Sequence, residues 1–134
     1  MTLKSGLKHL LPSILVCAIL LMSGTASAEP DDADKLKLKA SVLQHIEGHT
    51  EDGTYFFVSS KTTKLMKLKF VAMHPVVFEH PDGTYALCAD FEDGQKNKVL
   101  VDYYVQEIND RFVVLSSVEG KRSVLMGIAE KFGL

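Results

Sequence analysis

The sequence has no tryptophan, only two cysteines and only four prolines in 134 residues. So few cysteines exclude a disulfide-dense miniprotein, and the low proline and glycine content excludes a collagen-like repeat. The formal net charge is −2, so the chain lacks the excess of basic residues that broad nucleic-acid binding needs. The apolar fraction of 46% excludes a disordered chain. A small globular protein is left as the expected class.

The most specific pattern lies at the N-terminus. Lys4 and Lys8 precede an apolar run from Leu10 to Met22, and the small residues Ala26-Ser27-Ala28 follow that run. This order is typical of a cleaved secretory signal peptide. The run is too short for a membrane-spanning helix, which needs about 20 apolar residues. We therefore expect a signal peptide over residues 1–28 and a periplasmic or secreted mature protein without stable membrane insertion.

The two cysteines bear on the same question. Cys17 offers the alternative of a lipoprotein, but a lipid-modified cysteine follows a small residue, and here Val16 precedes it. Cleavage after Ala28 would remove Cys17 and leave Cys88 alone. A single cysteine cannot form an internal disulfide. In an oxidising compartment we expect Cys88 to be buried, paired with another chain, or reactive.

The mature chain begins with an acidic leader, residues 29–34, and residues 35–134 suit one domain. One of the three leader aspartates can cap a helix that runs to about Glu47 and stops at Gly48. The alternation of Lys35–Val42 also fits a strand. We favour a helix because lysine, leucine and alanine are good helix formers.

Turn signals then recur at short intervals and separate apolar segments. The segments are Thr54–Val58, Leu65–Met73, Val76–Phe78, Thr84–Glu92, Lys98–Gln106 and Arg111–Val118. Short strands joined by polar turns predict antiparallel hairpins. We expect an α+β fold, with the helix on one face of a four- to five-stranded meander sheet of cystatin-like or nuclear-transport-factor-like outline. Ser123 can cap a short C-terminal helix through Phe132.

Alternation assigns the two faces of the central predicted hairpin. The residues expected in the core beneath the helix are Tyr85, Leu87, Ala89, Phe91, Val99, Val101, Tyr103 and Val105. The opposite face carries Ala86, Cys88, Asp90, Glu92, Leu100, Asp102 and Tyr104.

The same stretch carries a resemblance to a family. A Tyr-x-x-Cys-x-Asp-Phe-x-Asp segment covers Tyr85–Asp93, His74 lies upstream, and an Asp-Tyr-Tyr strand follows at Asp102–Tyr104. This pattern resembles a group of small secreted bacterial domains of unassigned function. The resemblance implies a fold and a compartment but no activity. The group tends to place a histidine in the last strand, and Leu115–Arg122 contains none.

The outer face of this hairpin offers one chemical constellation. If the turn is centred on Lys96, Asp90 faces Asp102 directly and Cys88 lies one step along, with His74 within reach from the preceding strand. Thiolate, carboxylate and imidazole groups are ligands for zinc or copper. The favoured interpretation is plainer: the carboxylates accept hydrogen bonds and Cys88 is a small buried apolar residue. We therefore expect no cofactor, with zinc or copper as the alternative.

The hypothesis that these residues form an enzyme active site is less favoured. Asp90 and Asp102 could serve as a glycosidase acid/base pair, and Cys88 with His74 as a nucleophilic pair. However, the chain has no tryptophan for sugar stacking and no long loop that would form a cleft or an oxyanion site. A small hydrolase therefore ranks last among the candidate functions.

Two further groups of polar residues could bind partners. His45 and His49 have the spacing of two ligands on one helix face, but Gly48 lies between them, so we expect them not to share a face. Lysines occur in two clusters, which would form a basic patch if they were neighbours. These lysines are Lys35, Lys37, Lys39, Lys61, Lys64, Lys67 and Lys69.

Taken together, the sequence predicts an exported, non-enzymatic α+β domain. Its favoured role is a binding or accessory module of the cell envelope, with a small ligand or an envelope protein as partner and no nucleic acid. The alternative is a metal-binding or metal-delivery protein that uses Cys88, Asp90, Asp102 and His74.

Overall fold

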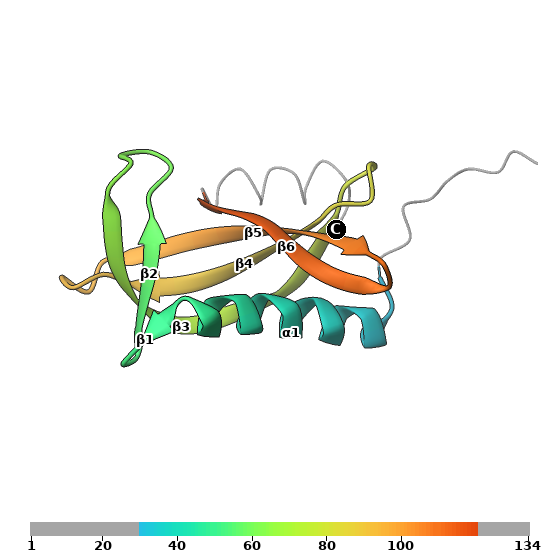
Figure 1. Cartoon of the computed structure of the whole chain (residues 1–134), viewed down its shortest axis with the longest axis horizontal. Coiled ribbons are helices and arrows are strands. Elements are labelled where there is room, and N and C mark those ends of the chain that lie inside the picture. Colours follow the sequence, from blue (N-terminus) through green and yellow to red (C-terminus); the bar gives the residue numbers. More distant parts are fainter. Residues whose placement is uncertain (1–29, 121–134) are drawn as a thin grey trace, which may run out of the picture.

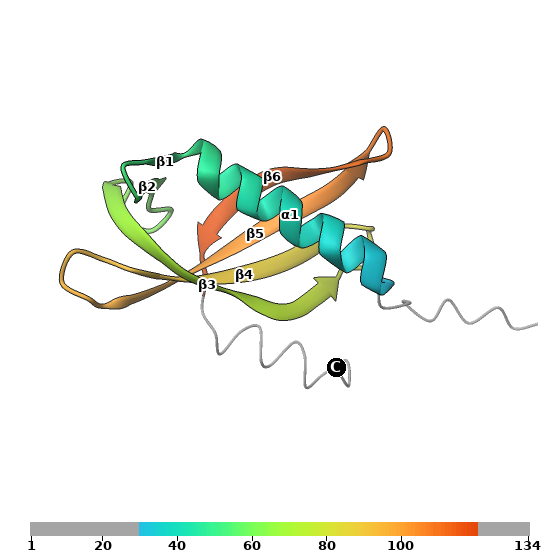
Figure 2. The same cartoon turned by 90° about the horizontal axis from the view of Figure 1, so that it is seen from below.

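The computed structural model describes residues 30–120. The helix α1 (Asp32–Gly48) is followed by β1 (Thr50–Glu51), β2 (Thr54–Val58), β3 (Leu65–Glu79), β4 (Tyr85–Glu92), β5 (Lys98–Ile108) and β6 (Arg111–Glu119). The strands form one antiparallel sheet in chain order, and α1 lies across one face of it, against β5 and β6 (Figures 1 and 2). An antiparallel sheet with one helix is consistent with an α+β arrangement. The expected signal peptide, residues 1–28, and the expected C-terminal helix, Ser123–Phe132, lie outside the described residues.

The expected four- to five-stranded meander of cystatin-like or nuclear-transport-factor-like outline is wrong, because the sheet has six strands. The extra strand is β1, which pairs with β2 around a two-residue turn, Asp52 and Gly53, with φ of 48° and 74°. Two consecutive positive φ angles are typical of the tightest hairpins. The sequence shows this stretch only as a turn after the helix, because a two-residue strand has no alternation to detect.

Strand β3 is also longer than expected. It runs continuously through Pro75, where the sequence predicted a break between two segments. Register shifts against β4 between Phe70 and Ala72, and between Met73 and Val77, accommodate the additional residues. Such irregularities bend a strand and redirect its side chains.

The helix matches its prediction closely. The Asp31 side chain accepts a hydrogen bond from the Asp34 backbone N–H at 2.8 Å, so Asp31 is the N-cap. Lys35–Val42 is helical, which resolves the alternative of a strand. The helix ends at Gly48, the predicted stop, and its buried side chains are Leu38, Val42 and Ile46.

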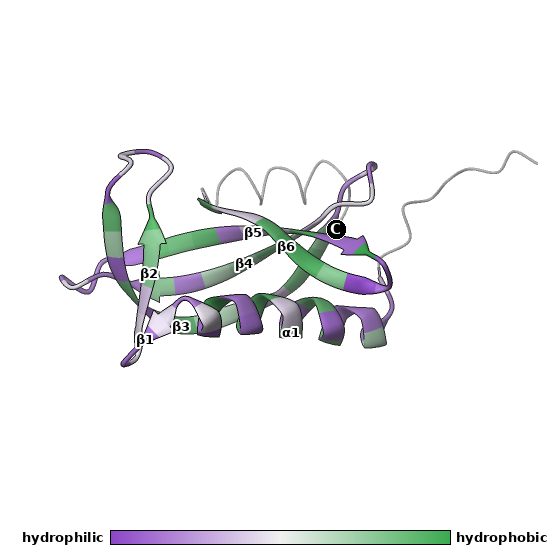
Figure 3. Ribbon diagram, viewed as in Figure 1, coloured by the Kyte–Doolittle hydropathy of each residue, from purple (hydrophilic) through white to green (hydrophobic). Residues whose placement is uncertain are grey.

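The predicted core face of β4 and β5 is confirmed. Leu87, Ala89, Phe91, Val101, Tyr103 and Val105 are buried in the core cluster, with Tyr85 and Val99 packed against it. The Tyr55 and Phe91 rings stack with centroids 4.8 Å apart, and the Tyr103 hydroxyl donates to the Tyr55 hydroxyl at 3.3 Å. Figure 3 shows hydrophobic residues concentrated in the strands and polar residues in the connecting loops. This core fixes which side chains point to the opposite face.

The turn between β4 and β5 sets the register of that opposite face. The Asp93 side chain accepts hydrogen bonds from the Gln95 and Asn97 backbone N–H groups, both at 2.8 Å. Glu92 pairs with Lys98, so the turn is centred on Gln95 and not on Lys96 as the sequence analysis assumed. Every cross-strand pair is therefore displaced by two residues from the expected one, and the two faces keep their residues.

Candidate functional site

A second set of buried residues lies on the sheet face away from α1. Phe78, Ala86, Cys88 and Asp102 are all buried but do not belong to the core cluster beneath the helix. Their pairings, Phe78 with Ala86 and Cys88 with Asp102, place them on one face of β3, β4 and β5. We call this set of side chains, together with His74 and Asp90, the outer-face cluster.

Within the outer-face cluster, Cys88 and Asp102 are direct cross-strand partners. The expected pairing of Asp90 with Asp102 is wrong, since Asp90 faces Leu100. The Cys88 side chain is hydrogen-bonded to the Asp102 carboxylate. Burial, that hydrogen bond and the charges of Asp102 and Asp90 all raise the pKa of the Cys88 thiol. Of the three states expected for this cysteine, the structure shows the buried one, with a protonated thiol as a weak donor.

Asp102 is a carboxylate in an unusual position, because only 5% of its surface is exposed. Burial raises the pKa of Asp102, while the hydrogen bond from Cys88 and the charge of His74 lower it. Its Oδ1 atom is buried and has no hydrogen-bond partner within residues 30–120. Leaving a buried acceptor without a donor costs about 1–3 kcal/mol, and more for a charged group.

Gly120 makes room for this carboxylate. A Cβ atom at Gly120 would overlap the Asp102 carboxylate, so any side chain there would force one of the two to move. The Gly120 backbone N–H donates to the Leu100 carbonyl at 2.9 Å, which holds the glycine beside β5. No local sequence pattern marks the approach of Gly120 to Asp102.

A polar contact anchors the chain just before Gly120. The Ser59 hydroxyl donates to the Glu119 carboxylate, which links the end of β2 to the end of β6. Ser59 is 1% exposed, and its Oγ also accepts from the backbone N–H of Thr62 at 3.1 Å. The contact joins residues far apart in sequence, so the sequence analysis did not find it.

His74 and Asp90 form the second pair of the cluster. His74 Nε2 lies 3.0 Å from Asp90 Oδ2, and both side chains are partly exposed. His74 lies in the irregular part of β3 between the Met73 and Val77 pairings. The expectation that His74 reaches the hairpin from the preceding strand is thus confirmed, with Asp90 as its partner.

The four predicted residues therefore share one face as two adjacent pairs, Cys88–Asp102 and His74–Asp90. The charge of His74 acts on Asp102 and the charge of Asp90 acts on Cys88, so the two pairs are electrostatically coupled. Among residues 30–120, no three His, Cys, Asp or Glu side chains are grouped so that they could hold a metal ion. The arrangement presents a buried acceptor, Asp102 Oδ1, beside the partly exposed contact between His74 and Asp90.

His45 and His49 differ from the expectation. Their rings lie side by side with centroids 4.4 Å apart, because α1 continues through Gly48 and keeps the two residues on one face. The spacing of four was the correct signal, and the glycine between them does not interrupt the helix. The pair lies at the end of α1, on the helix side of the sheet.

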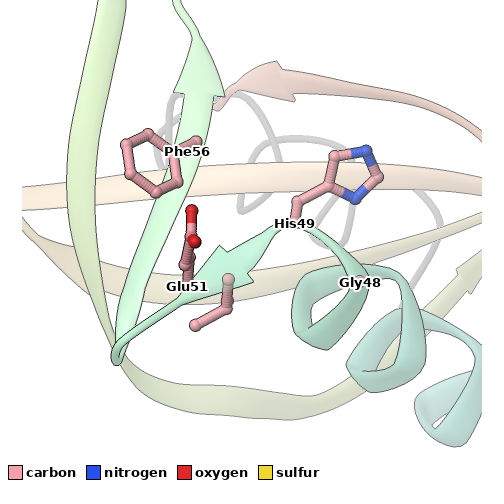
Figure 4. A pocket seen from close by; sticks show the side chains of 5 residues that line it. Gly48, His49, Glu51 and Phe56 are labelled. Carbon is pink, nitrogen blue, oxygen red and sulfur yellow. The ribbon is translucent and has the colours of Figure 1, made fainter.

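An open hollow of about 390 Å³ lies beside the end of α1. Its lining residues are Gly48, His49, Thr50, Glu51 and Phe56. Figure 4 shows the His49 ring turned away from Glu51 and Phe56, so the polar groups do not converge on one point. This hollow is therefore a weaker candidate for a ligand site than the outer-face cluster.

The two lysine clusters do not meet. The first half of α1 and the β2–β3 loop lie at opposite ends of the molecule in both views (Figures 1 and 2). Lys37 also contacts Asp34 at 3.0 Å, and Lys61 lies 4.0 Å from Glu119. A joint basic patch is thus absent from the described part of the chain.

The described part of the chain holds no helix with the length and hydropathy to cross a membrane.

Comparisons with known proteins do not identify a function for this chain. The resemblance to small secreted bacterial domains stays a prediction. Neither a family model nor a curated protein nor a solved structure matches this chain.

Proposed function

We propose that this protein is an exported, non-enzymatic binding domain of the cell envelope. Its ligand would be a small molecule that presents a hydrogen-bond donor or a positive charge to Asp102. The observation that carries the proposal is the buried Asp102 carboxylate, whose Oδ1 has no donor within residues 30–120. Buried polar groups in folded proteins are nearly always paired, so an unpaired one indicates a position that a ligand can fill.

The surroundings of Asp102 suit a cationic or donor ligand. A carboxylate in a low-dielectric environment binds a positive charge more strongly than an exposed one does. Tyr104 lies on the same face, and its ring is 6.2 Å from that of His80, so aromatic surface adjoins the acidic group. Aromatic faces attract cations, which adds to the same preference.

The protonation states favour binding over nucleophilic catalysis. The thiolate is the reactive form of cysteine, and the raised pKa of Cys88 disfavours it. His74 contacts Asp90, so the partner that this structure gives the imidazole is a carboxylate and not the Cys88 sulfur. The Asp102 carboxylate beside Cys88 raises the pKa of the thiol and so favours the protonated form, which is not the reactive one.

Export rests on the N-terminal sequence. The lysines, the short apolar run and Ala26-Ser27-Ala28 together match the pattern of a cleaved secretory signal. A chain with this signal would act in the periplasm or outside the cell, where small binding domains meet extracellular ligands.

A metal-binding or metal-delivery role is the second candidate. Its donors would be the sulfur, oxygen and nitrogen atoms of the Cys88–Asp102 and His74–Asp90 pairs, which suit zinc or copper. These side chains would have to move together to hold one ion, because no three of them are grouped for a metal within residues 30–120. Coordination by the thiolate would require Cys88 to lose its proton, so affinity would fall as the pH is lowered. The two candidates therefore differ in the role of Cys88. An organic ligand contacts Asp102 and leaves the thiol protonated, whereas a metal ion would be held by the Cys88 thiolate.

Native mass spectrometry tests both. Wild-type protein purified from the envelope is compared with Asp102→Asn and with Asp110→Asn, a matched change in an exposed turn. We expect an added non-covalent mass in the wild type and in Asp110→Asn, and none in Asp102→Asn. The proposal would be overturned if none of the three proteins carried an added mass, or if Asp102→Asn retained the ligand.

A third variant separates the two candidates. With Cys88→Ser, an organic ligand that contacts Asp102 stays bound, whereas a metal held by the thiolate is lost. The added mass itself also identifies the ligand, because zinc and copper have characteristic masses.

A further inference from the structure

Two neighbouring histidines at the C-terminal end of α1 form a second group of potential ligands, on the opposite side of the sheet from the outer-face cluster. His45 and His49 are four residues apart, and their ring centroids are 4.4 Å apart. Two histidines at this spacing on a helix can coordinate one metal ion together. His49 is exposed and His45 is half-buried, so the pair is open to solvent on one side.

A backbone contact fixes the tautomer of His49. Its Nδ1 atom lies 2.8 Å from the His45 carbonyl oxygen. A carbonyl oxygen only accepts hydrogen bonds, so Nδ1 must carry the proton and donate it. The lone pair of the neutral ring is then on Nε2, which is free to coordinate. Metal-binding histidines are commonly held in this way, with the other ring nitrogen donating to a backbone carbonyl.

The surroundings of His45 limit the orientations of its ring. The ring packs edge-on against that of Tyr103, with centroids 5.9 Å apart. A ligand that is already oriented loses less free energy on coordination.

We propose that His45 and His49 together bind one late first-row divalent metal ion, with water in the remaining positions. Imidazole suits copper, nickel and zinc, and Cu²⁺ binds nitrogen ligands most tightly in this series. No further His, Cys, Asp or Glu within residues 30–120 groups with this pair as a third ligand. The site would therefore bind metal reversibly at the surface.

The test is a Cu²⁺ titration of the purified protein at neutral pH, followed by calorimetry and electron paramagnetic resonance. We expect one reversibly bound ion whose spectrum shows nitrogen coordination. His49→Ala removes an exposed side chain and should weaken binding by about tenfold or more, because the two-ligand chelate is lost. His45→Gln gives a second variant that keeps a polar side chain of similar size.

A matched control keeps the result specific. His80→Ala removes one histidine elsewhere in the fold and should leave Cu²⁺ affinity unchanged. His74→Ala tests the competing site in the outer-face cluster. Wild-type affinity in both His49→Ala and His45→Gln would overturn the proposal. Loss of binding in His74→Ala alone would place the metal at the outer-face cluster and overturn it as well.

Discussion

Cys88 stands directly opposite Asp102 on neighbouring strands, and its thiol is hydrogen-bonded to the Asp102 carboxylate. Both residues are almost fully buried, at 2% and 5% exposure. The thiol is a weak donor, and Oδ1 of the carboxylate has no partner within residues 30–120. A half-satisfied buried carboxylate destabilises a fold, so we interpret Asp102 as a binding residue and not as a structural one.

The state of Cys88 leads to a first prediction. In a chain with Cys17→Ser, iodoacetamide should label Cys88 slowly in native buffer and rapidly in denaturant, because burial and the raised pKa both suppress the thiolate. Labelling rates read by mass spectrometry check this. Equal rates in the two conditions would mean that the thiol is exposed and available to another chain.

The approach of Gly120 to Asp102 gives a second prediction. Gly120→Ala should lower the free energy of unfolding by about 1–3 kcal/mol, because the added Cβ would overlap the carboxylate. Gly94→Ala is the control, since a Cβ there meets nothing within 4 Å. Urea unfolding should show a change of less than about 0.5 kcal/mol for the control. Similar losses in the two variants would show that the steric conflict is unimportant.

The assignment of the core face gives a third prediction. Leu87→Ala should cost about 2–5 kcal/mol, because Leu87 is fully buried beneath α1. Leu36→Ala serves as its partner, since Leu36 is 70% exposed and alanine is a good helix former. Thermal and urea unfolding of both variants measure the difference. If Leu87→Ala lowered the stability no more than Leu36→Ala does, Leu87 would not lie in the core, and the core face of β4 would be assigned wrongly.

The assignment of faces was predictable because it depends on local alternation. Leu87 and Val101 lie in strands whose side chains alternate with period two, and a shift of two residues between strands leaves each face unchanged. The helix was equally accessible, since Asp31 and Gly48 are local signals at its two ends.

The pairing within the outer face was not predictable in the same way. The register depends on the hydrogen bonds of Asp93 to the backbone of Gln95 and Asn97, which centre the turn on Gln95. The alternation of apolar and polar residues does not determine where the turn is centred. The sequence analysis therefore placed Asp90 opposite Asp102, whereas in the structure Cys88 is opposite Asp102. The close approach of Gly120 to Asp102 was also not predictable, because the two residues are far apart in sequence and only the tertiary fold brings them together.

The histidine pair shows a different kind of error. The helix ends at Gly48, as predicted, and its C-cap is His49. The error was to infer that a residue just beyond the last helical one leaves the helix face. The His45 and His49 rings lie 4.4 Å apart, and His49 Nδ1 is 2.8 Å from the His45 carbonyl oxygen.

Export yields a fourth prediction that does not depend on the fold. Mature protein from the envelope should begin at Glu29, since Ala26-Ser27-Ala28 places small residues before the cleavage position. Intact-mass measurement of the purified protein checks this directly. Soluble cytosolic protein that retains Met1 would contradict export and would restore Cys17 to the functional chain.

The most direct measurement of the central claim compares the free energy of unfolding of ligand-free wild type and Asp102→Asn at neutral and acidic pH. Burial raises the pKa of Asp102, so the folded protein holds that proton more tightly than the unfolded chain does. The stability gained from this proton is present below the unfolded pKa and lost as the pH rises through the folded one.

Asparagine is neutral at every pH, so Asp102→Asn does not lose stability when the pH rises through the folded pKa of Asp102. If Asp102 serves binding, Asp102→Asn should match or exceed the wild type in stability at neutral pH, and its relative advantage should shrink in acid. A loss of more than about 2 kcal/mol at neutral pH would instead show that the carboxylate makes an essential structural contact, and would contradict the account.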